Sequence, residues 1–389
     1  MTGNDAVAGD AAVTVVTVTY GDRWEAGLAR TLASVLSDPR LFVIVVLNGA
    51  GAATRARLDA ARAAAPGRLQ LIDLGANRGS APAFADGLAA AYLRGAPVLL
   101  LDDDNPLPGD AIERLAAITR QADVSGEPPT ALACYRAVNP IHALLRDGAS
   151  VASCFAEMRP GAFLSTDVFP ARRTPAADER LSVETGDRIE HLVELPNAMW
   201  GGLYLPLSIV RLGILPPAEL VLYADDNAFS GLLRDAGCRI RLCLDIEIVD
   251  TVDWRESAEP PRSPLRIPRA LRTPRAEWWR VQYQSRNAAH LSVVRARTSR
   301  RARARLAVNA STRLSLLLFA AVISGRLPVY LRILRASLDG LRGRLGPSYP
   351  LPGSIEHPGD GPARSRARRR RSRPPRGQAH HDDGREVSS

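Results

Sequence analysis

The chain has 389 residues, 46% of them hydrophobic, and a formal net charge of +10. This length and composition exclude a small or highly polar protein that cannot bury a hydrophobic core. The chain is long enough for two or three structural units. Eight arginines and no acid lie between Arg364 and Arg376, which leaves roughly +2 for the rest of the chain. The basic character therefore belongs mainly to a tail, and it does not mark the folded part as a nucleic-acid binder.

The cysteines and the N-terminus indicate a cytoplasmic protein. None of the cysteines shows zinc-type spacing, so reduced thiols of a cytosolic protein are expected. These cysteines are Cys134, Cys154, Cys238 and Cys243. Residues 1–12 are polar and mildly acidic, unlike a signal peptide. No uninterrupted apolar run reaches the length that spans a bilayer, and the apolar stretch at 314–323 is about half that length.

The first third of the chain alternates strand and helix patterns. The predicted strands cover 13–20, 41–47, 69–74 and 98–101, and the predicted helices cover 25–37, 54–65, 83–94 and 111–120. Strands that alternate with helices predict βαβ units with right-handed crossovers. We therefore expect an α/β fold, with a Rossmann-like, mostly parallel sheet flanked by helices.

The middle of the chain is less regular. It contains candidate strands at 131–135 and 163–166, a polar loop at 172–188, and a short helix near 207–212. A helix at 223–236 ends at a glycine, and two closing strands follow at 240–244 and 246–249. Our division of the chain is a flexible 1–11, an α/β domain at 12–255, a helical extension at 256–345 and a disordered basic tail at 346–389.

A strand that ends in three carboxylates is the strongest functional signal. Asp102, Asp103 and Asp104 follow an apolar run, at the strand end where open α/β sheets bind ligands. Three adjacent carboxylates need a cation, and Mg2+ or Mn2+ prefers such oxygen ligands. The alternative is an Asp-rich turn before a helix. Asp110 with Glu113 predicts a capping box there, which leaves the triplet unexplained.

Two turns belong to the same predicted edge of the sheet. They are Asn48-Gly49 and Asn77-Arg78-Gly79, each of which alone is ordinary turn chemistry. Arg78 at a helix start suits an anionic ligand, although a solvated arginine is the commoner explanation. A nucleotide lying across this edge would place its base near the turns and its diphosphate near the acidic triplet.

Two later motifs have both a functional and a structural interpretation. Asp225 and Asp226 open a helix, where one carboxylate caps the free amides and a second can act as a general base. Two capping acids are an equal alternative. Trp200-Gly201-Gly202 allows a close backbone approach with an aromatic wall beside it, or it is a core tryptophan next to a glycine bend.

Together these motifs resemble, in order and spacing, those of family-2 glycosyltransferases with a GT-A fold. The resemblance covers about residues 12 to 295 and includes the segment Tyr283-Gln284-Ser285-Arg286-Asn287. The most similar branch is the bacterial galactofuranosyltransferase-like and rhamnosyltransferase-like enzymes, which share a triple aspartate and an Asp-Asp helix start.

The resemblance implies a role for each motif. Asp102 and Asp104 would face the metal, Mn2+ or Mg2+, while Asp226, or else Asp225, would deprotonate the acceptor. The residues implied to contact the nucleotide and donor are Asn48, Asn77, Arg78, Asp103, Trp200, Gly201 and Gly202. The implied chemistry is a single displacement that inverts the anomeric centre while the metal stabilises the leaving diphosphate.

Three positions depart from the pattern of the family. Leu47 stands where an aspartate commonly helps to hold the base, and Ala228 stands where an acid usually follows the Asp-Asp pair. A metal-binding histidine is also missing after the last strands, where Asp250 is a possible substitute ligand. The core acids remain, so an active enzyme is expected.

We therefore expect an inverting, metal-dependent hexosyltransferase with a nucleotide-sugar donor, UDP-galactofuranose or dTDP-rhamnose. The expected acceptor is a cell-wall glycan or other polysaccharide, including a lipid-linked glycan at the inner face of the plasma membrane. One alternative is a nucleotidyltransferase, whose glycine-rich loop is poorly matched by 20–23. Another is an Arg-rich nucleic-acid-binding or scaffold protein, although no specific nucleic acid is expected.

The region after residue 294 combines arginines with apolar residues. Six arginines lie between Arg295 and Arg305, and apolar residues concentrate at 314–323 and 327–334. Basic flanks on apolar helices suit peripheral contact with an anionic membrane surface. The alternative is a helical pair that packs on the catalytic domain or forms an oligomer.

Overall fold

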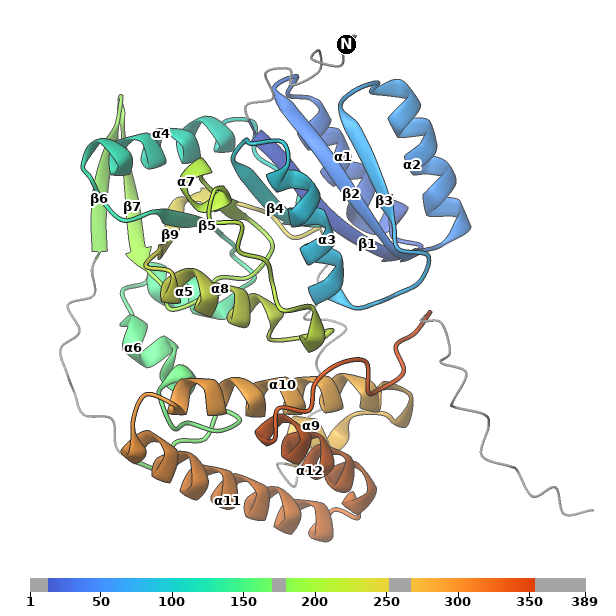
Figure 1. Ribbon diagram of the computed structural model, residues 1–389, viewed down its shortest axis with the longest axis vertical. Coiled ribbons are helices and arrows are strands. Elements are labelled where there is room, and N and C mark those ends of the chain that lie inside the picture. The colour runs from blue at the N-terminus through green and yellow to red at the C-terminus, as the bar shows by residue number, and fades with distance from the viewer. Residues whose placement is uncertain (1–12, 170–179, 252–266, 354–389) are drawn as a thin grey trace, which may run out of the picture. The chain divides into compact units, whose positions relative to one another are not determined.

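The computed structural model describes residues 13–169, 180–251 and 267–353 (Figure 1). These belong to a compact unit that extends to residue 355. The proposed N-terminal segment 1–11 and most of the proposed tail lie outside the described residues. The domain boundaries proposed from the sequence stay predictions.

A nine-stranded sheet forms the centre of the unit, with strand order β3-β2-β1-β4-β8-β5-β9-β7-β6. The strands are β1 (Val13–Gly21), β2 (Leu41–Ala50), β3 (Leu69–Asp73), β4 (Val98–Asp102), β5 (Thr130–Tyr135), β6 (Arg180–Thr185), β7 (Arg188–Glu194), β8 (Leu203–Leu205) and β9 (Arg239–Glu247). The first four strands in this order are parallel, as predicted. β8 runs antiparallel to both β4 and β5, so the second half of the sheet is mixed.

Helices cover both faces of this sheet. The helices are α1 (Ala29–Leu36), α2 (Ala52–Ala64), α3 (Ser80–Tyr92), α4 (Ala111–Val124), α5 (Pro140–Arg146), α6 (Val151–Cys154), α7 (Leu207–Val210), α8 (Asp225–Asp235), α9 (Arg269–Arg272), α10 (Trp278–Ala296), α11 (Arg300–Ile323) and α12 (Leu327–Leu341). A π-helical turn, Trp24–Leu28, leads into α1. Phe84 of α3 and Phe229 of α8 pack on one face, and Leu58 of α2 and Leu115 of α4 pack on the other.

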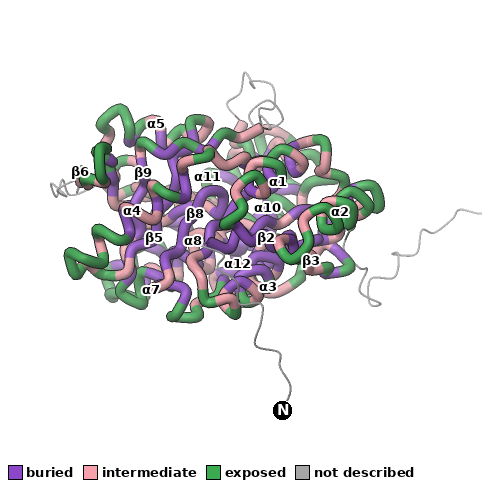
Figure 2. Tube along the Cα trace, turned by 90° about the horizontal axis from the view of Figure 1, so that it is seen from above, coloured by how far each residue is buried: buried purple, intermediate pink, exposed green. Residues whose placement is uncertain are grey.

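Burial on both faces explains the continuous apolar runs of the central strands. Val16 and Ile44 belong to one core cluster, and Val15 and Val43 belong to the other. Figure 2 shows the central strands as buried, in contrast to the exposed outer side of α2. The predicted α/β class, with helices on a largely parallel sheet and a C-terminal helical region, is confirmed.

Several local predictions are wrong. The described part of the expected loop 172–188 begins a hairpin, β6 and β7, because β7 pairs with β9 and extends the sheet. Residues 170–179 of that loop lie outside the described residues. The two expected closing strands are the single β9, and 163–166 forms an isolated bridge instead of a strand. The predicted capping box is absent, since the Asp110 carboxylate accepts from Arg188 at 2.6 Å and makes no cap.

The C-terminal helices pack mainly through α10, which contacts both α11 and α12. Residues 346–353, which composition assigns to the tail, also make defined contacts. The Gly346 amide donates to the Glu219 carbonyl at 2.7 Å, and Leu351 is buried. All four cysteines are free thiols, as expected, and Cys154 is the least buried of them.

Candidate active site

A cavity of about 320 Å³ lies beyond the carboxyl end of β4 and joins the two acidic motifs. Its lining includes Asp102 from the strand end and Trp200 from the loop before β8. Asp225 and Asp226, at the start of α8, line the same cavity. Asp102 and the α8 acids, more than 120 residues apart in sequence, therefore share one space.

Arg136, which directly follows β5, bridges two carboxylates at this edge. Its Nη1 donates to Asp102 Oδ2 at 2.9 Å, and its Nε donates to Asp250 Oδ2 at 3.1 Å. The Arg136 amide donates to Nδ1 of the buried His142 at 3.1 Å. Asn105 adds a bond from Nδ2 to Asp250 Oδ1 at 3.2 Å. Asp250 is thus the buried partner of a guanidinium group, with a side chain only 1% exposed.

Asp103 is held in a second ion pair on the other side of the strand end. Thr19 Oγ1 donates to Asp103 Oδ2 at 2.8 Å, and Arg23 Nη2 donates to Oδ1 at 3.0 Å. Burial raises the pKa of Asp103, while Arg23 and Thr19 oppose that shift. Arg23 Nε also donates to Asp103 Oδ2 at 3.3 Å, so the carboxylate predicted to contact the nucleotide sugar already accepts three hydrogen bonds from protein groups.

Asp104 is the least compensated carboxylate of the triplet. Arg23 Nη2 lies 3.7 Å from Asp104 Oδ2, beyond hydrogen-bond distance. Burial, together with the charges of Asp102 and Asp103, raises the pKa of Asp104 to about 6. The backbone of this residue is fixed, because its carbonyl accepts from the Thr251 amide at 2.9 Å.

The edge fits a divalent cation that a substrate helps to hold, and it does not form a protein cage. Four carboxylates face two guanidinium groups, those of Arg23 and Arg136, which leaves an excess of two negative charges. Within the described part of the chain, no three potential ligands gather into a metal cluster. Asp102 and Asp104 suit a metal completed by phosphate oxygens and water. Ligation by Asp250 stays a prediction that requires Arg136 to move away.

Asp225 is a buried acceptor with neutral donors. Ser80 Oγ donates to Asp225 Oδ2 at 2.7 Å, and Trp200 Nε1 donates to the same oxygen at 3.0 Å. Burial raises the pKa of Asp225, and these two donors oppose the shift. The Trp200 ring stacks on Phe84 at 4.6 Å and is mostly buried, so it is chiefly a core side chain that orients Asp225.

Asp226 is more accessible and has fewer partners. Its Oδ1 accepts from the Asn227 amide at 2.7 Å. Burial, with the neighbouring charges of Asp225 and Asp102, raises the pKa of Asp226 to about 7. A carboxylate with that proton affinity is suited to accept a proton from a hydroxyl at neutral pH. The Asn227 amide belongs to the first turn of α8, so Asp226 also satisfies a free amide of this helix, whose N-cap residue, Ala224, makes no side-chain cap.

The loop before α8 is strained. Val221, with φ 67° and ψ −62°, centres a γ-turn in which the Leu222 amide donates to the Leu220 carbonyl at 2.7 Å. Tyr223 and Ala224 also have positive φ, 67° and 59°. Such conformations cost about 1–3 kcal/mol each and persist only where other contacts enforce them.

Asn287 of α10 supplies those contacts. Its Nδ2 lies 2.8 to 2.9 Å from the carbonyl oxygens of Leu220, Leu222 and Tyr223. Arg286 Nη2 adds a bond to the Leu220 carbonyl at 2.9 Å, and Arg286 Nε donates to Asn287 Oδ1 at 2.9 Å. Both side chains are fully buried. The helical extension thus fixes the backbone that presents Asp225 and Asp226.

The polar groups of the two turns mostly bind each other. Asn48 Oδ1 accepts from the Arg78 amide at 2.7 Å, and Asn48 Nδ2 donates to the Gly79 carbonyl at 3.1 Å. Asn77 Nδ2 donates to the Pro352 carbonyl at 3.0 Å. The Arg78 side chain is exposed. Nucleotide contact by Asn48, Asn77 and Arg78 stays a prediction, with Arg78 the most available of them.

Gly201 and Gly202 have steric reasons to be glycine. A Cβ on Gly201 would lie 2.5 Å from both Asp102 Oδ2 and Arg136 Nη1, so a side chain would break that ion pair. Gly202 has φ +88°, and its amide donates to the Leu100 carbonyl at 2.8 Å. These glycines make room for the charged edge, and donor contact through them stays a prediction.

Sequence reasoning missed three contributors, which are Arg136, Ser80 and the loop-binding role of Asn287. Arg136 could have been found, because it follows a buried strand at the same edge as the acidic triplet. Ser80 gave no signal, and Asn287 was visible only as part of the segment 283–287, since the partners of both residues lie far away in sequence.

The chain was compared with protein families, curated proteins and solved structures. Residues 14–146 match the family model described as Glycosyl transferase family 2. The matched segment carries the triplet, both turns and Arg136, and it ends before Trp200 and the α8 acids. A comparison with curated proteins finds no match.

Three solved structures illustrate the similarity. Residues 1–349 of S. aureus TarS are 12% identical, with 85% of this chain and 81% of that one covered and a TM-score of 0.45. The mannosyltransferase PcManGT from Pyrobaculum calidifontis, in complex with GDP-Man and Mn2+, is 18% identical, with coverages of 86% and 88% and a TM-score of 0.41. GalNAc-T7, with UDP, GalNAc and Mn2+, is 13% identical with a TM-score of 0.44. This match covers 61% of our chain and 43% of GalNAc-T7.

Proposed function

We propose that this protein is a family-2 glycosyltransferase that moves a sugar from a nucleotide-sugar donor to a hydroxyl group of an acceptor. The observation that carries the proposal is the shared cavity. Asp226, with a pKa raised to about 7, lines the same 320 Å³ space as the strand-end Asp102. The match of residues 14–146 to the glycosyltransferase family supports the assignment.

The chemistry is a single displacement with inversion. The acceptor oxygen attacks the anomeric carbon as its proton passes to a carboxylate oxygen of Asp226. The bond from the anomeric carbon to the donor phosphate oxygen breaks, and the nucleoside diphosphate leaves with the electron pair. The bonds from Ser80 and Trp200 oppose the rise that burial causes in the pKa of Asp225, and the charge of Asp225 increases the proton affinity of Asp226.

The strand end would manage the charge of the diphosphate. Asp102 and Asp104 would hold a divalent cation, which supplies neutralising charge to the leaving group when bound. Arg136 fixes one oxygen of Asp102, and Arg23 fixes Asp103, so the carboxylates do not need to reorganise during the reaction. The proposed donor is UDP-galactofuranose or dTDP-rhamnose, and the proposed acceptor is a cell-envelope or polysaccharide glycan.

Thermal-shift screening of UDP-, GDP- and dTDP-sugars, with and without Mn2+, tests donor binding. At least one nucleotide sugar should stabilise the protein more strongly with Mn2+ than without it, and Asp104→Ala should reduce that difference. A donor-hydrolysis assay on the stabilising sugar then tests the enzyme activity. If no nucleotide sugar stabilises the protein, and Asp104→Ala changes nothing, the proposal is wrong.

A further inference from the structure

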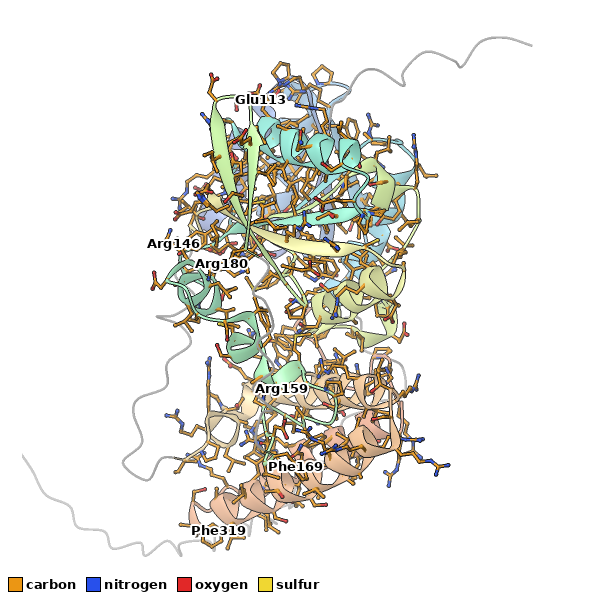
Figure 3. The ribbon with its side chains drawn as sticks, turned by 90° about the vertical axis from the view of Figure 1, so that its left-hand side faces the viewer. Glu113, Arg146, Arg159, Phe169, Arg180 and Phe319 are labelled. Atoms are coloured by element: carbon orange, nitrogen blue, oxygen red, sulfur yellow. The ribbon has the colours of Figure 1, made fainter. Side chains whose placement is uncertain are left out.

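The surface of α11 that faces away from the rest of the protein is strongly apolar. Its C-terminal half exposes five large apolar residues, and the start of α12 adds two more. They are Leu316, Leu318, Phe319, Val322, Ile323, Leu327 and Leu331. We refer to these seven residues as the outer apolar surface. Phe319 is 67% exposed, and Figure 3 shows it at the edge of α11 away from the sheet.

The exposure follows the geometry of the helix. At 100° per residue, the five α11 members of the outer apolar surface fall within an arc of about 160°. The residues that α11 buries, including Leu306, Ala310, Leu317 and Ala321, lie on the opposite side. A helix of a soluble protein normally places polar residues on its exposed side. The apolar exposed side of α11 therefore indicates a binding partner.

Basic residues border the outer apolar surface at both ends. Arg300, Arg301 and Arg303 are exposed in the first turn of α11, and Arg326, Arg332 and Arg335 are exposed at α12. Arg301 precedes Phe319 by 18 residues, about five helical turns, so both point to the same side of the helix. None of the six forms an ion pair with a residue that the structure describes.

Charge in this region is unusually one-sided. Residues 300–353 contain ten arginines and one acid, Asp339. Three arginines at the N-terminus of α11 also oppose the helix dipole, and no acid in the first turn offsets them. An anionic partner would relieve both effects. An apolar surface between clusters of exposed arginines is complementary to a lipid bilayer with anionic headgroups.

The helix fits a position in the plane of the membrane. By length and composition α11 is able to cross a bilayer, although 28% of its most apolar window is buried. Its buried side nevertheless holds it to the protein. Asn309 Nδ2 donates to the Gly161 carbonyl at 2.8 Å, and Arg305 Nη2 pairs with Asp167 at 2.8 Å. Crossing the membrane would break these contacts, whereas lying on the surface keeps them.

We propose that the outer apolar surface and its bordering arginines dock this protein on an anionic membrane, with α11 in the plane of the interface. The proposal does not depend on the glycosyltransferase assignment. It concerns residues outside the cavity, and docking is measured without any donor or acceptor.

Vesicle co-sedimentation of the full chain tests the proposal. The probes are phosphatidylcholine vesicles alone and vesicles with about one third phosphatidylglycerol. The unmodified chain should prefer the anionic vesicles. Phe319→Gln/Val322→Gln/Ile323→Gln should weaken binding at least about ten-fold. Reversing Arg326 and Arg332 to glutamate should weaken it about 25-fold or more, since each cation contributes about a factor of five.

Control variants distinguish binding by the outer apolar surface from non-specific hydrophobic binding and from binding by the basic tail. Leu93→Gln/Val124→Gln removes two exposed apolar residues elsewhere, 91% and 84% exposed, and should bind like the unmodified chain. Replacing the eight tail arginines of 364–376 with serine should leave binding that still depends on Phe319. Unchanged melting temperatures show that the substituted chains are folded.

Four results would overturn the proposal. One is equal binding to neutral and anionic vesicles, and another is full binding by the triple glutamine variant. Resistance of vesicle-bound protein to alkaline carbonate extraction would instead indicate a membrane-spanning α11. If the chain were a dimer that the triple glutamine variant dissociates, and bound no vesicles, the surface would be an interface between two copies.

Discussion

The two acidic centres of the cavity solve the problem of buried negative charge in opposite ways. At the end of β4, guanidinium groups pair with three of the carboxylates, since Arg136 bridges Asp102 and Asp250 and Arg23 holds Asp103. At the start of α8, Asp225 accepts from the uncharged side chains of Ser80 and Trp200. The first arrangement fixes carboxylates in ion pairs, which suits binding a cation or positioning a diphosphate. The second raises proton affinity, which suits proton transfer.

Asp226→Asn should remove the proposed proton acceptor at the start of α8, and we expect it to have the largest effect on activity. The amide cannot accept the proton, so transfer should fall about 1,000-fold while donor binding persists. The measurements are kcat for transfer and donor-induced thermal shift. Asp235→Asn, at the exposed end of the same helix, is the matched control and should leave both unchanged. Normal transfer by Asp226→Asn would move the base to Asp225 or elsewhere.

Arg136→Met should disrupt the ion pairs at the end of β4. It leaves Asp250 buried without its cation, so the free energy of unfolding should fall by about 3 kcal/mol, as measured by urea denaturation. Arg57→Met, an exposed change in α2, should have almost no effect. Arg136→Met/Asp250→Leu should recover most of the loss. If the double variant is as unstable as the single one, the bridge is not what stabilises this edge.

Asn287→Ala should loosen the loop that presents Asp226 without touching the cavity. The Leu222 and Tyr223 carbonyl groups lose this donor, while the Leu220 carbonyl keeps Arg286, so kcat should fall about 30-fold and stability by about 2 kcal/mol. The KM for the donor should change much less, because Asn287 acts as a positioning residue. Gln284→Ala, on the exposed side of α10, is the control. An unchanged kcat would show that the strained loop keeps its shape without Asn287.

The pH dependence of stability gives a smaller effect that tests the raised proton affinity of Asp226. Asp226 has a pKa near 7 in the folded protein and an ordinary value of 3.8, so the folded state binds more protons between these values. Stability should therefore decrease as pH rises from 4 to 7 and then level off. Asp226→Asn should flatten this decrease and stabilise the protein at pH 8 by about 1 kcal/mol. A melting-temperature profile steeper for Asp226→Asn than for the unmodified chain would contradict this.

Local patterns predicted the parallel half of the sheet and the place of the acidic triplet at the end of β4 well. The β1–β4 strands are apolar on both faces, and parallel strands bring their ends to one edge whatever the details. The roles of individual groups were less predictable. The partners that bury Asp250 and Asn48 are distant in sequence, so no local pattern reveals them. The β6–β7 hairpin depends on pairing with β9. Asn287 was visible as part of a motif, but its acceptors lie more than 60 residues earlier.

The strained loop at 221–224 also has a thermal consequence. Its γ-turn and its left-handed residues hold their conformation mainly through the Asn287 amide, while the sheet is held by a continuous apolar core. Local opening of such a loop needs less free energy than global unfolding. On heating, the loop should relax before the sheet melts. Turnover should then decline at temperatures where circular dichroism still reports a folded protein, and cooling should restore it.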